Sequence, residues 1–384
     1  MKINRDLLLV AISLAIWGIG DGLFIYFQPI YLQEWVADPV LIGTILGGMG
    51  VAMAVAQIPA GYLSDRLGSR SIMWASWILG TVAAWVMALA NSAPAFVVGL
   101  LLYGMTGFVM APMNSYIASV RGNFSVGRAL TFVSGLYNLG AVLGPLAGGL
   151  LAEKMGLRTV YLGAGILFIL STITVLFVSK NAQPHHQDQE STQAKGLLAN
   201  SRFLSFLGIT LVTIFVLYLP YPFTPNFLKN QQALSEGTIG ILGSFASLGN
   251  AVAVLAFGNL RPMLAFMIGQ GWVLVCALFF LKGNSPVWFG LGYFFLGGLR
   301  LSKSMILTIT RSFIHPSETG LAYGMVEAAS SVAMILAPVL AGALYKQDPW
   351  LIYEVPAYAI AAVMVLNLAI LYFSRRREAH ANSI

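Results

Sequence analysis

The chain has 384 residues, of which 58% are hydrophobic and only 9% charged, and its formal net charge is +7. Soluble domains carry about 25% charged residues, so this composition excludes an ordinary soluble protein and indicates one built for a bilayer. A spanning helix needs about 20 apolar residues, and twelve of them with short loops would use nearly the whole length. The positive charge is therefore interpreted as a topology signal, and no nucleic-acid partner is expected.

Apolar runs predict twelve spans in chain order. Their approximate bounds are 7–33, 40–62, 71–91, 94–118, 128–152, 159–179, 203–228, 237–258, 262–282, 286–310, 320–345 and 352–374. With both termini placed in the cytoplasm, 14 of the 21 Lys and Arg residues fall on that side and five fall outside. The positive-inside rule therefore predicts a multi-pass protein of the cell (inner) membrane with both termini cytoplasmic.

The longest polar stretch predicts a cytoplasmic linker at 181–202, between six-helix domains at 1–180 and 203–384. The halves also repeat: Gly127–Leu151 aligns without gaps on Gly320–Leu344, so that Pro145 falls on Pro338. Internal duplication of this kind is typical of secondary transporters, with the substrate site between the repeats. The linker holds adjacent histidines, which are interpreted as linker residues rather than metal ligands. With a single cysteine in an apolar run, neither a disulfide, a metal nor a cofactor is expected.

The stretch 61–70 is rich in charge and glycine and is predicted to be a short polar hairpin between spans two and three. It resembles the Gly-x-Leu-x-Asp-Arg-x-Gly-Arg-basic signature of the major facilitator superfamily, with Ser69 where a basic residue is usual. The matching residues are Gly61, Leu63, Asp65, Arg66, Gly68 and Arg70. The resemblance implies an all-α membrane fold of two pseudo-symmetric six-helix bundles that works by alternating access. It also implies a conformational gating role for Gly61, Asp65, Arg66, Gly68 and Arg70, with Asp65 near the start of span eleven.

Span five carries small residues four positions apart, in Gly140-x-x-x-Gly144-Pro145-x-x-Gly148-Gly149. Small residues at this spacing let helices approach closely in lipid, which is one interpretation of the pattern. The other is a resemblance to the drug–proton antiporter branch of the superfamily, which implies export and a gating role for Gly144 and Pro145. An arginine usual in span four of that branch is absent, and Tyr103 precedes the Gly104-Met-Thr-Gly107 run instead.

Four ionisable residues lie well inside predicted spans, away from their ends, where each is costly and hence a functional candidate. They are Asp21, Arg300, Lys303 and Glu327. Asp21 and Glu327 are the predicted proton-coupling residues, and Asp21, Arg300 and Lys303 are predicted to bind substrate. Because helices 1, 4, 7 and 10 line the cavity in the superfamily, the resemblance places Asp21 opposite Arg300. The alternative for all four is interhelical ion pairing that only holds the bundle together.

Further substrate-binding candidates are polar or aromatic residues within the spans. They are Tyr26, Gln28, Asn114, Tyr137, Tyr218 and Tyr221. Tyr218 and Tyr221 lie among three prolines of span seven, which predict a break in that helix. For Asn114 and Tyr137, helix–helix hydrogen bonding is the alternative.

The sequence therefore predicts a secondary active transporter and not an enzyme. It is expected to export small amphipathic compounds, with protons as coupling ion, and to act as a monomer in the lipid bilayer. The alternative is proton-coupled transport of an organic anion, such as a carboxylate, a phosphate or a lipid headgroup, bound by Arg300 and Lys303.

Overall fold

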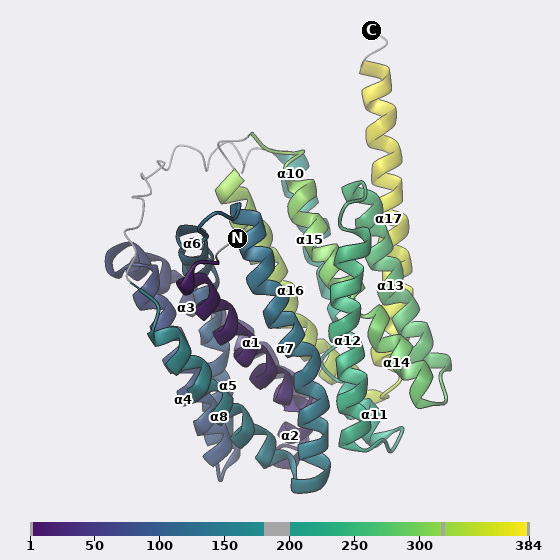
Figure 1. The fold of residues 1–384 in the computed structure, drawn as a ribbon. Coiled ribbons are helices and arrows are strands. Elements are labelled where there is room, and N and C mark those ends of the chain that lie inside the picture. The colour runs from purple at the N-terminus through teal and green to yellow at the C-terminus, as the bar shows by residue number, and fades with distance from the viewer. Residues whose placement is uncertain (1–2, 180–199, 316–318, 382–384) are drawn as a thin grey trace. The chain divides into compact units, whose positions relative to one another are not determined.

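A computed structural model describes residues 3–179, 200–315 and 319–381 (Figure 1). Those residues contain helices and no strand, and eleven of their helices are long and apolar enough to cross a membrane. The prediction of an all-α membrane protein is therefore confirmed. The predicted linker, 181–202, lies outside the described residues as far as position 199, and the predicted domain bounds stay a prediction.

The first of two compact units combines the described residues of Met1–Gln189 with those of Pro222–Ser247. Its helices are α1 (Arg5–Ile25), α2 (Gln28–Trp35), α3 (Pro39–Leu67), α4 (Ser69–Leu89), α5 (Ala93–Met105), the 3₁₀ turn η1 (Thr106–Val109), α6 (Met110–Ser119), α7 (Val126–Met155), α8 (Leu157–Leu176), α11 (Thr224–Asn230) and α12 (Glu236–Phe257) as far as Ser247. Two elements of the second half of the sequence, α11 and the start of α12, thus belong to a unit otherwise made of the first half.

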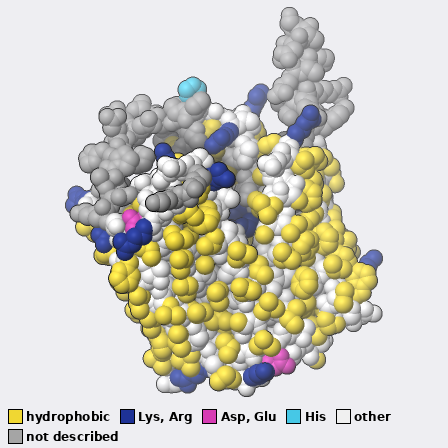
Figure 2. Space-filling view, viewed as in Figure 1, with side chains coloured by type: hydrophobic (Ala, Val, Ile, Leu, Met, Phe, Trp, Pro, Cys, Tyr) yellow, Lys and Arg dark blue, Asp and Glu magenta, His cyan; other side chains and the backbone are white. Residues whose placement is uncertain are grey.

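The second unit combines the described residues of Glu190–Tyr221 and Leu248–Ile384. Besides the end of α12, its helices are α10 (Ser201–Tyr218), α13 (Pro262–Lys282), α14 (Pro286–Phe295), α15 (Gly298–Thr310), α16 (Thr319–Gln347) and α17 (Leu351–Ala381). Each unit has an apolar core: one surrounds Met73 and Trp77 of α4, and the other surrounds Phe203 and Phe266. Many large hydrophobic side chains remain exposed, and Figure 2 shows them over the helices, as a lipid-facing surface requires.

Four predicted spans are divided into shorter helical pieces. Span 7–33 breaks between α1 and α2, and span 203–228 breaks between α10 and α11. Pro29 and Pro225 lie in the first turns of α2 and α11, where a missing N–H costs nothing. The break predicted from the prolines of span seven is therefore confirmed. Span 94–118 is interrupted by η1, and span 286–310 is divided into α14 and α15.

The predicted loop at 61–70 is wrong, because the chain there is almost entirely helical. Helix α3 continues to Leu67 and α4 begins at Ser69, so that Gly68 alone joins them. Gly68 has φ 83° and ψ 150°, a backbone conformation that other residues rarely adopt. The charged residues extend α3 beyond its apolar part, where the Arg66 guanidinium packs 4.4 Å from the centroid of the Tyr62 ring.

The internal repeat is visible as two helices of matching length. Helix α7 has 30 residues and α16 has 29, and each carries an internal proline, Pro145 and Pro338. The two prolines occupy the equivalent positions that the sequence alignment assigns to them. The repeat thus survives as structure, as well as in sequence.

Candidate functional site

The centre of the candidate site is the carboxylate of Asp21, which lies within α1 and remains partly exposed. The Tyr103 hydroxyl of α5 donates to Asp21 Oδ1 at 2.5 Å, and the Tyr137 hydroxyl of α7 donates to Oδ2 at 2.9 Å. Among the described residues no Lys, Arg or His forms an ion pair with Asp21. The carboxylate is thus held by neutral donors, and its charge is not matched by a basic partner.

An aromatic wall surrounds one side of this carboxylate. The Trp17 ring stacks on Phe168 at 4.0 Å between centroids and lies parallel to Tyr103 at 6.4 Å. Phe24 meets the Tyr103 ring edge-on at 5.1 Å. Such packing fixes the ring that carries the donor hydroxyl, so Tyr103 is held in place toward Asp21.

Asp21 reaches Tyr137 because α1 and α7 approach each other very closely. A Cβ added at Gly144 would lie 2.6 Å from Gly22 Cα, and one added at Gly18 would overlap the Tyr137 carbonyl oxygen. Gly140 and Gly148 face the α1 backbone in the same way. The small-residue pattern of span five therefore has the packing role that was one of its two interpretations.

Tyr26 and Gln28 flank the break between α1 and α2, and both side chains are buried. The Tyr26 hydroxyl lies 3.5 Å from Ser247 Oγ, and its ring covers Gly243 of α12. The Gln28 Nε2 group is buried with no hydrogen-bond partner. Gln28 therefore has an unused donor.

Next to them, helices α2 and α11 are joined by side-chain amides. Asn226 Nδ2 donates to the Pro29 carbonyl oxygen at 3.0 Å and to Gln33 Oε1 at 2.7 Å. Asn230 Nδ2 donates to the same Gln33 oxygen at 3.0 Å. Asn226 is only 1% exposed, and its Oδ1 has no partner. We call Gln33, Asn226 and Asn230 the amide clasp.

Charged residues lie beside the amide clasp. Lys229 Nζ of α11 forms a 2.7 Å ion pair with Glu236 Oε1 of α12. At Glu34 of α2, desolvation raises the pKa of the carboxyl above its ordinary value of 4.5; the Lys229 charge opposes this rise and the Glu236 charge adds to it. The Glu34 side chain remains exposed, so solvent weakens these effects.

Helices α7 and α12 also touch within the first unit. Ser244 Oγ donates to the Val142 carbonyl oxygen at 2.7 Å, and a Cβ added at Gly240 would overlap the Pro145 carbonyl oxygen. Of the residues predicted to gate through span five, Gly144 therefore faces α1, and Pro145 places its ring against Gly22 of α1 and its carbonyl oxygen against α12. Their gating role itself stays a prediction.

In the second unit, the predicted cations of α15 have different surroundings. Lys303 Nζ forms a 3.0 Å ion pair with Glu327 Oε2 of α16. Arg300 is exposed, and among the described residues its guanidinium forms no ion pair. The two basic residues are therefore not equivalent, since only Arg300 is available to an anion without breaking a bridge.

The remaining predicted residues lie apart from Asp21. Asn114 of α6 is exposed, and the rings of Tyr218 and Tyr221 stack on each other at 5.2 Å in the second unit. Gly61 and Asp65 belong to α3, but the surroundings of Gly61 and the side chain of Asp65 fall outside what the structure describes. Most of the segment predicted to meet Asp65 also lies outside the described residues.

Arg66 and Arg70 of the hairpin stretch lie against aromatic rings. The Arg70 guanidinium lies 3.9 Å from the centroid of the Trp74 ring, as Arg66 lies against Tyr62. Their gating role also stays a prediction, because these contacts are local.

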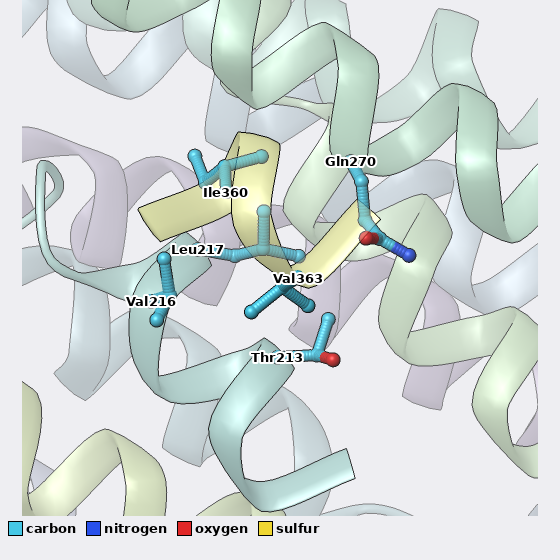
Figure 3. Close-up of a pocket in the computed structure, with 6 residues that line it drawn as sticks. All are labelled: Thr213, Val216, Leu217, Gln270, Ile360 and Val363. Carbon is cyan, nitrogen blue, oxygen red and sulfur yellow. The ribbon is translucent and has the colours of Figure 1, made fainter. Parts of the chain in front are cut away.

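A small cavity in the second unit is a poor ligand site. It is lined by Thr213, Val216, Leu217, Gln270, Ile360 and Val363, and Figure 3 shows the two polar side chains among aliphatic ones. It has no room for a water molecule.

Sequence reasoning missed the roles of Tyr103 and Asn226. Tyr103 was noted only as standing where an arginine is usual in span four, yet its hydroxyl is the nearest donor to Asp21. Asn226 follows Pro225 directly, and an amide beside a proline-broken helix was the available signal. Neither contact could be placed without the positions of α1, α2 and α5.

Comparison with known proteins identifies the family to which this fold belongs. The Major Facilitator Superfamily matches residues 10–221 and 206–384. The quinolone resistance protein NorA of Staphylococcus aureus is 22% identical over 390 residues, 98% of each chain. The multidrug resistance protein MdtG of Salmonella arizonae is 27% identical over 284 residues, 72% of this chain and 70% of MdtG.

A solved structure of the nucleoside transporter NupG has the same fold. Its TM-score is 0.82 at 14% identity, with 96% of this chain and 99% of NupG covered. Identity this low supports the fold and not the substrate. With a family match over nearly the entire length and spans that follow the expected order, the chain belongs to the major facilitator superfamily and is a multi-pass membrane transporter.

Proposed function

We propose that this transporter exports small amphipathic compounds in exchange for protons, and that Asp21 is the residue that takes up the proton. The observation that carries the proposal is the Asp21 carboxylate with its two tyrosine donors and no ion-pair partner among the described residues. A carboxylate inside a membrane span is energetically costly, and such residues generally mark functional sites. Because hydroxyl groups rotate, Tyr103 and Tyr137 can remain hydrogen-bonded in both protonation states.

Asp21 is a better proton acceptor in this scheme than Glu327. Glu327 already has Lys303 as its ion-pair partner, so that protonation would break a bridge and leave a cation without its counter-charge. Asp21 loses no bridge on protonation. We therefore assign coupling to Asp21 and a structural pairing role to Glu327.

The direction and substrate class follow the relatives. Two of them are named for resistance to quinolones and to multiple drugs, and the NorA match extends over 98% of this chain. The Trp17 ring near Asp21 is partly exposed and offers flat apolar surface to an amphipathic molecule, while Phe24 is buried behind Tyr103. The protein would act as a monomer in the inner membrane, with both termini in the cytoplasm.

The experiment is uptake of a fluorescent amphipathic compound by everted membrane vesicles, in which export appears as accumulation in the lumen. Accumulation should follow an imposed pH gradient with the lumen acidic and stop when nigericin collapses that gradient. Transport that depends on a sodium gradient, or that ignores both gradients, would contradict the proposal. Vesicles without the protein provide the background.

The alternative function is proton-coupled transport of an organic anion, favoured by the exposed Arg300 without an ion-pair partner. With Lys303 engaged by Glu327, the anion would rely on one guanidinium instead of the two cations expected from the sequence. Thermal stabilisation of purified protein by anions separates the two functions. Stabilisation by an organic anion that Arg300→Ala abolishes would favour the alternative, and stabilisation by neutral or cationic amphiphiles that depends on Asp21 would favour export.

A further inference from the structure

We propose that the amide clasp of Gln33, Asn226 and Asn230 is the external gate of this transporter. Two buried polar atoms without hydrogen-bond partners, Gln28 Nε2 and Asn226 Oδ1, set how readily the gate opens. The proposal rests on the alternating-access transport proposed above. It concerns α2 and α11, at the end of the first unit that the distribution of Lys and Arg predicts to face outward.

The amide clasp joins two short helices, each separated from the preceding helix by a break. Helix α2 has eight residues and follows the break after α1, while α11 has seven and follows the break after α10. Hinges of this kind absorb backbone rotation at the ends of elements. Asn226 fastens the two helices by donating both to the Pro29 carbonyl and to Gln33 Oε1.

The fastening is incomplete, because two polar groups remain unmatched. Gln28 Nε2 and Asn226 Oδ1 are buried without a hydrogen-bond partner, in residues only 4% and 1% exposed. A buried polar group without a partner disfavours the state that buries it. Opening would expose both groups to water. The amide hydrogen bonds therefore stabilise the closed gate, and the two polar groups without partners destabilise it.

This arrangement predicts opposite effects for neighbouring amides. Removing the Asn226 amide loses two bonds between the helices and should favour opening. Replacing Gln28 with an apolar side chain of similar length removes the unmatched donor and should favour closing. A purely structural role would change the thermal midpoints of the variants and leave the accessibility of the outward-facing pathway unchanged.

The contact between α7 and α12 supplies a reporter for opening. Ser244 is 7% exposed and donates to the Val142 carbonyl oxygen of α7. Ser244→Cys is a small change, and its thiol is shielded as long as α7 and α12 touch. The chain has one native cysteine, Cys276, which is buried, so Cys276→Ala gives a clean background.

The experiment measures the rate at which a membrane-impermeant maleimide labels Ser244→Cys in right-side-out vesicles without an energy source, a pH gradient or substrate. Asn226→Leu should raise the rate about tenfold, the factor expected from losing one or two net hydrogen bonds. Gln28→Met should lower it by about threefold or more. Asn91→Leu, the same chemical change at an exposed loop residue, should leave the rate unchanged.

A second route of perturbation guards against a variant that fails to fold. Gln33→Leu removes the acceptor shared by Asn226 and Asn230 and should also speed labelling. The double variant Gln33→Leu/Asn226→Leu should label less than the product of the single effects predicts, because both remove one common bond. Thermal midpoints identify any variant whose fast labelling reflects unfolding.

Unchanged labelling in Asn226→Leu and Gln33→Leu would overturn the gate, and faster labelling in Gln28→Met would overturn the role of the unmatched donor. Neither outcome bears on proton coupling, since the assay uses no gradient and no substrate. Conversely, loss of the Asp21 assignment would leave these rates unaffected. The two proposals therefore fail separately.

Discussion

Tyr103 and Asp21 are 82 positions apart in the sequence, and the Tyr103 hydroxyl donates a 2.5 Å hydrogen bond to Asp21 Oδ1. Both donors to this intramembrane carboxylate are phenols, those of Tyr103 and Tyr137. A phenol orients the carboxylate without neutralising it. The charge at Asp21 therefore remains available to a proton or to a cationic group of a substrate.

The bond between Tyr103 and Asp21 should be measurable as a coupling energy. Tyr103→Phe should lower the free energy of unfolding by about 1–2 kcal/mol, because a buried donor to a carboxylate is lost. In an Asp21→Ala background the same substitution should cost almost nothing. Thermal unfolding in detergent measures both, with Tyr358→Phe, at a side chain 80% exposed, as the control. Additive effects would mean that the two side chains do not interact.

The close approach of α1 and α7 predicts opposite outcomes for two glycines of one helix. Gly144→Ala should destabilise the protein by about 1–3 kcal/mol, since its Cβ would lie 2.6 Å from Gly22 Cα and the helices would have to separate. A Cβ added at Gly135 would meet no atom within 4 Å, so Gly135→Ala should be neutral or should stabilise the protein by up to about 1 kcal/mol. Equal thermal midpoints for the two variants would argue against the packing.

The ion pair of Lys303 and Glu327 should behave as a structural pair. Both side chains are partly exposed, 36% and 45%, so breaking the pair should cost less than about 1 kcal/mol. Glu327→Gln should keep gradient-driven transport, and the exchange Lys303→Glu/Glu327→Lys should keep more activity than Lys303→Glu alone. Loss of gradient-driven transport in Glu327→Gln with substrate exchange intact would instead make Glu327 the coupling residue.

The Glu34 carboxyl predicts a pH dependence of stability beside the amide clasp. Its pKa is raised, chiefly by desolvation, so the charged form is disfavoured in the folded protein. The penalty is present above the folded pKa and disappears as the pH falls toward the ordinary value of 4.5. Glu34→Gln should therefore be more stable than the wild type near neutral pH, by less than about 1 kcal/mol because Glu34 is exposed, and the two should converge on acidification. A thermal-midpoint series against pH checks this, and a difference that grows as the pH falls would contradict it.

Much of the architecture could be predicted because its signals are local. Apolar runs place the spans, and the prolines near Tyr218 place the break before α11. The charged stretch after Gly61 was misassigned because glycine and charge usually indicate a loop. At the end of a span, however, a helix can project its charged turns beyond the apolar region, as α3 does.

The site could be predicted only one residue at a time. Asp21 is recognisable because a lone acid in an apolar run is costly, and Arg300 for the corresponding reason. The contact of Tyr103 with Asp21 and that of Asn226 with Pro29 could not be predicted, because each joins helices that are far apart in the sequence. The pairing of Lys303 with Glu327 was among the alternatives, and structure was needed to select it.

The central claim is that Asp21 takes up the coupling proton, and transport by purified Asp21→Asn in proteoliposomes tests it most directly. We predict that the variant still exchanges labelled for unlabelled substrate at equal pH, because binding and alternating access remain, but that an imposed pH gradient no longer drives net accumulation. Gradient-driven accumulation at the wild-type level in Asp21→Asn would contradict the account.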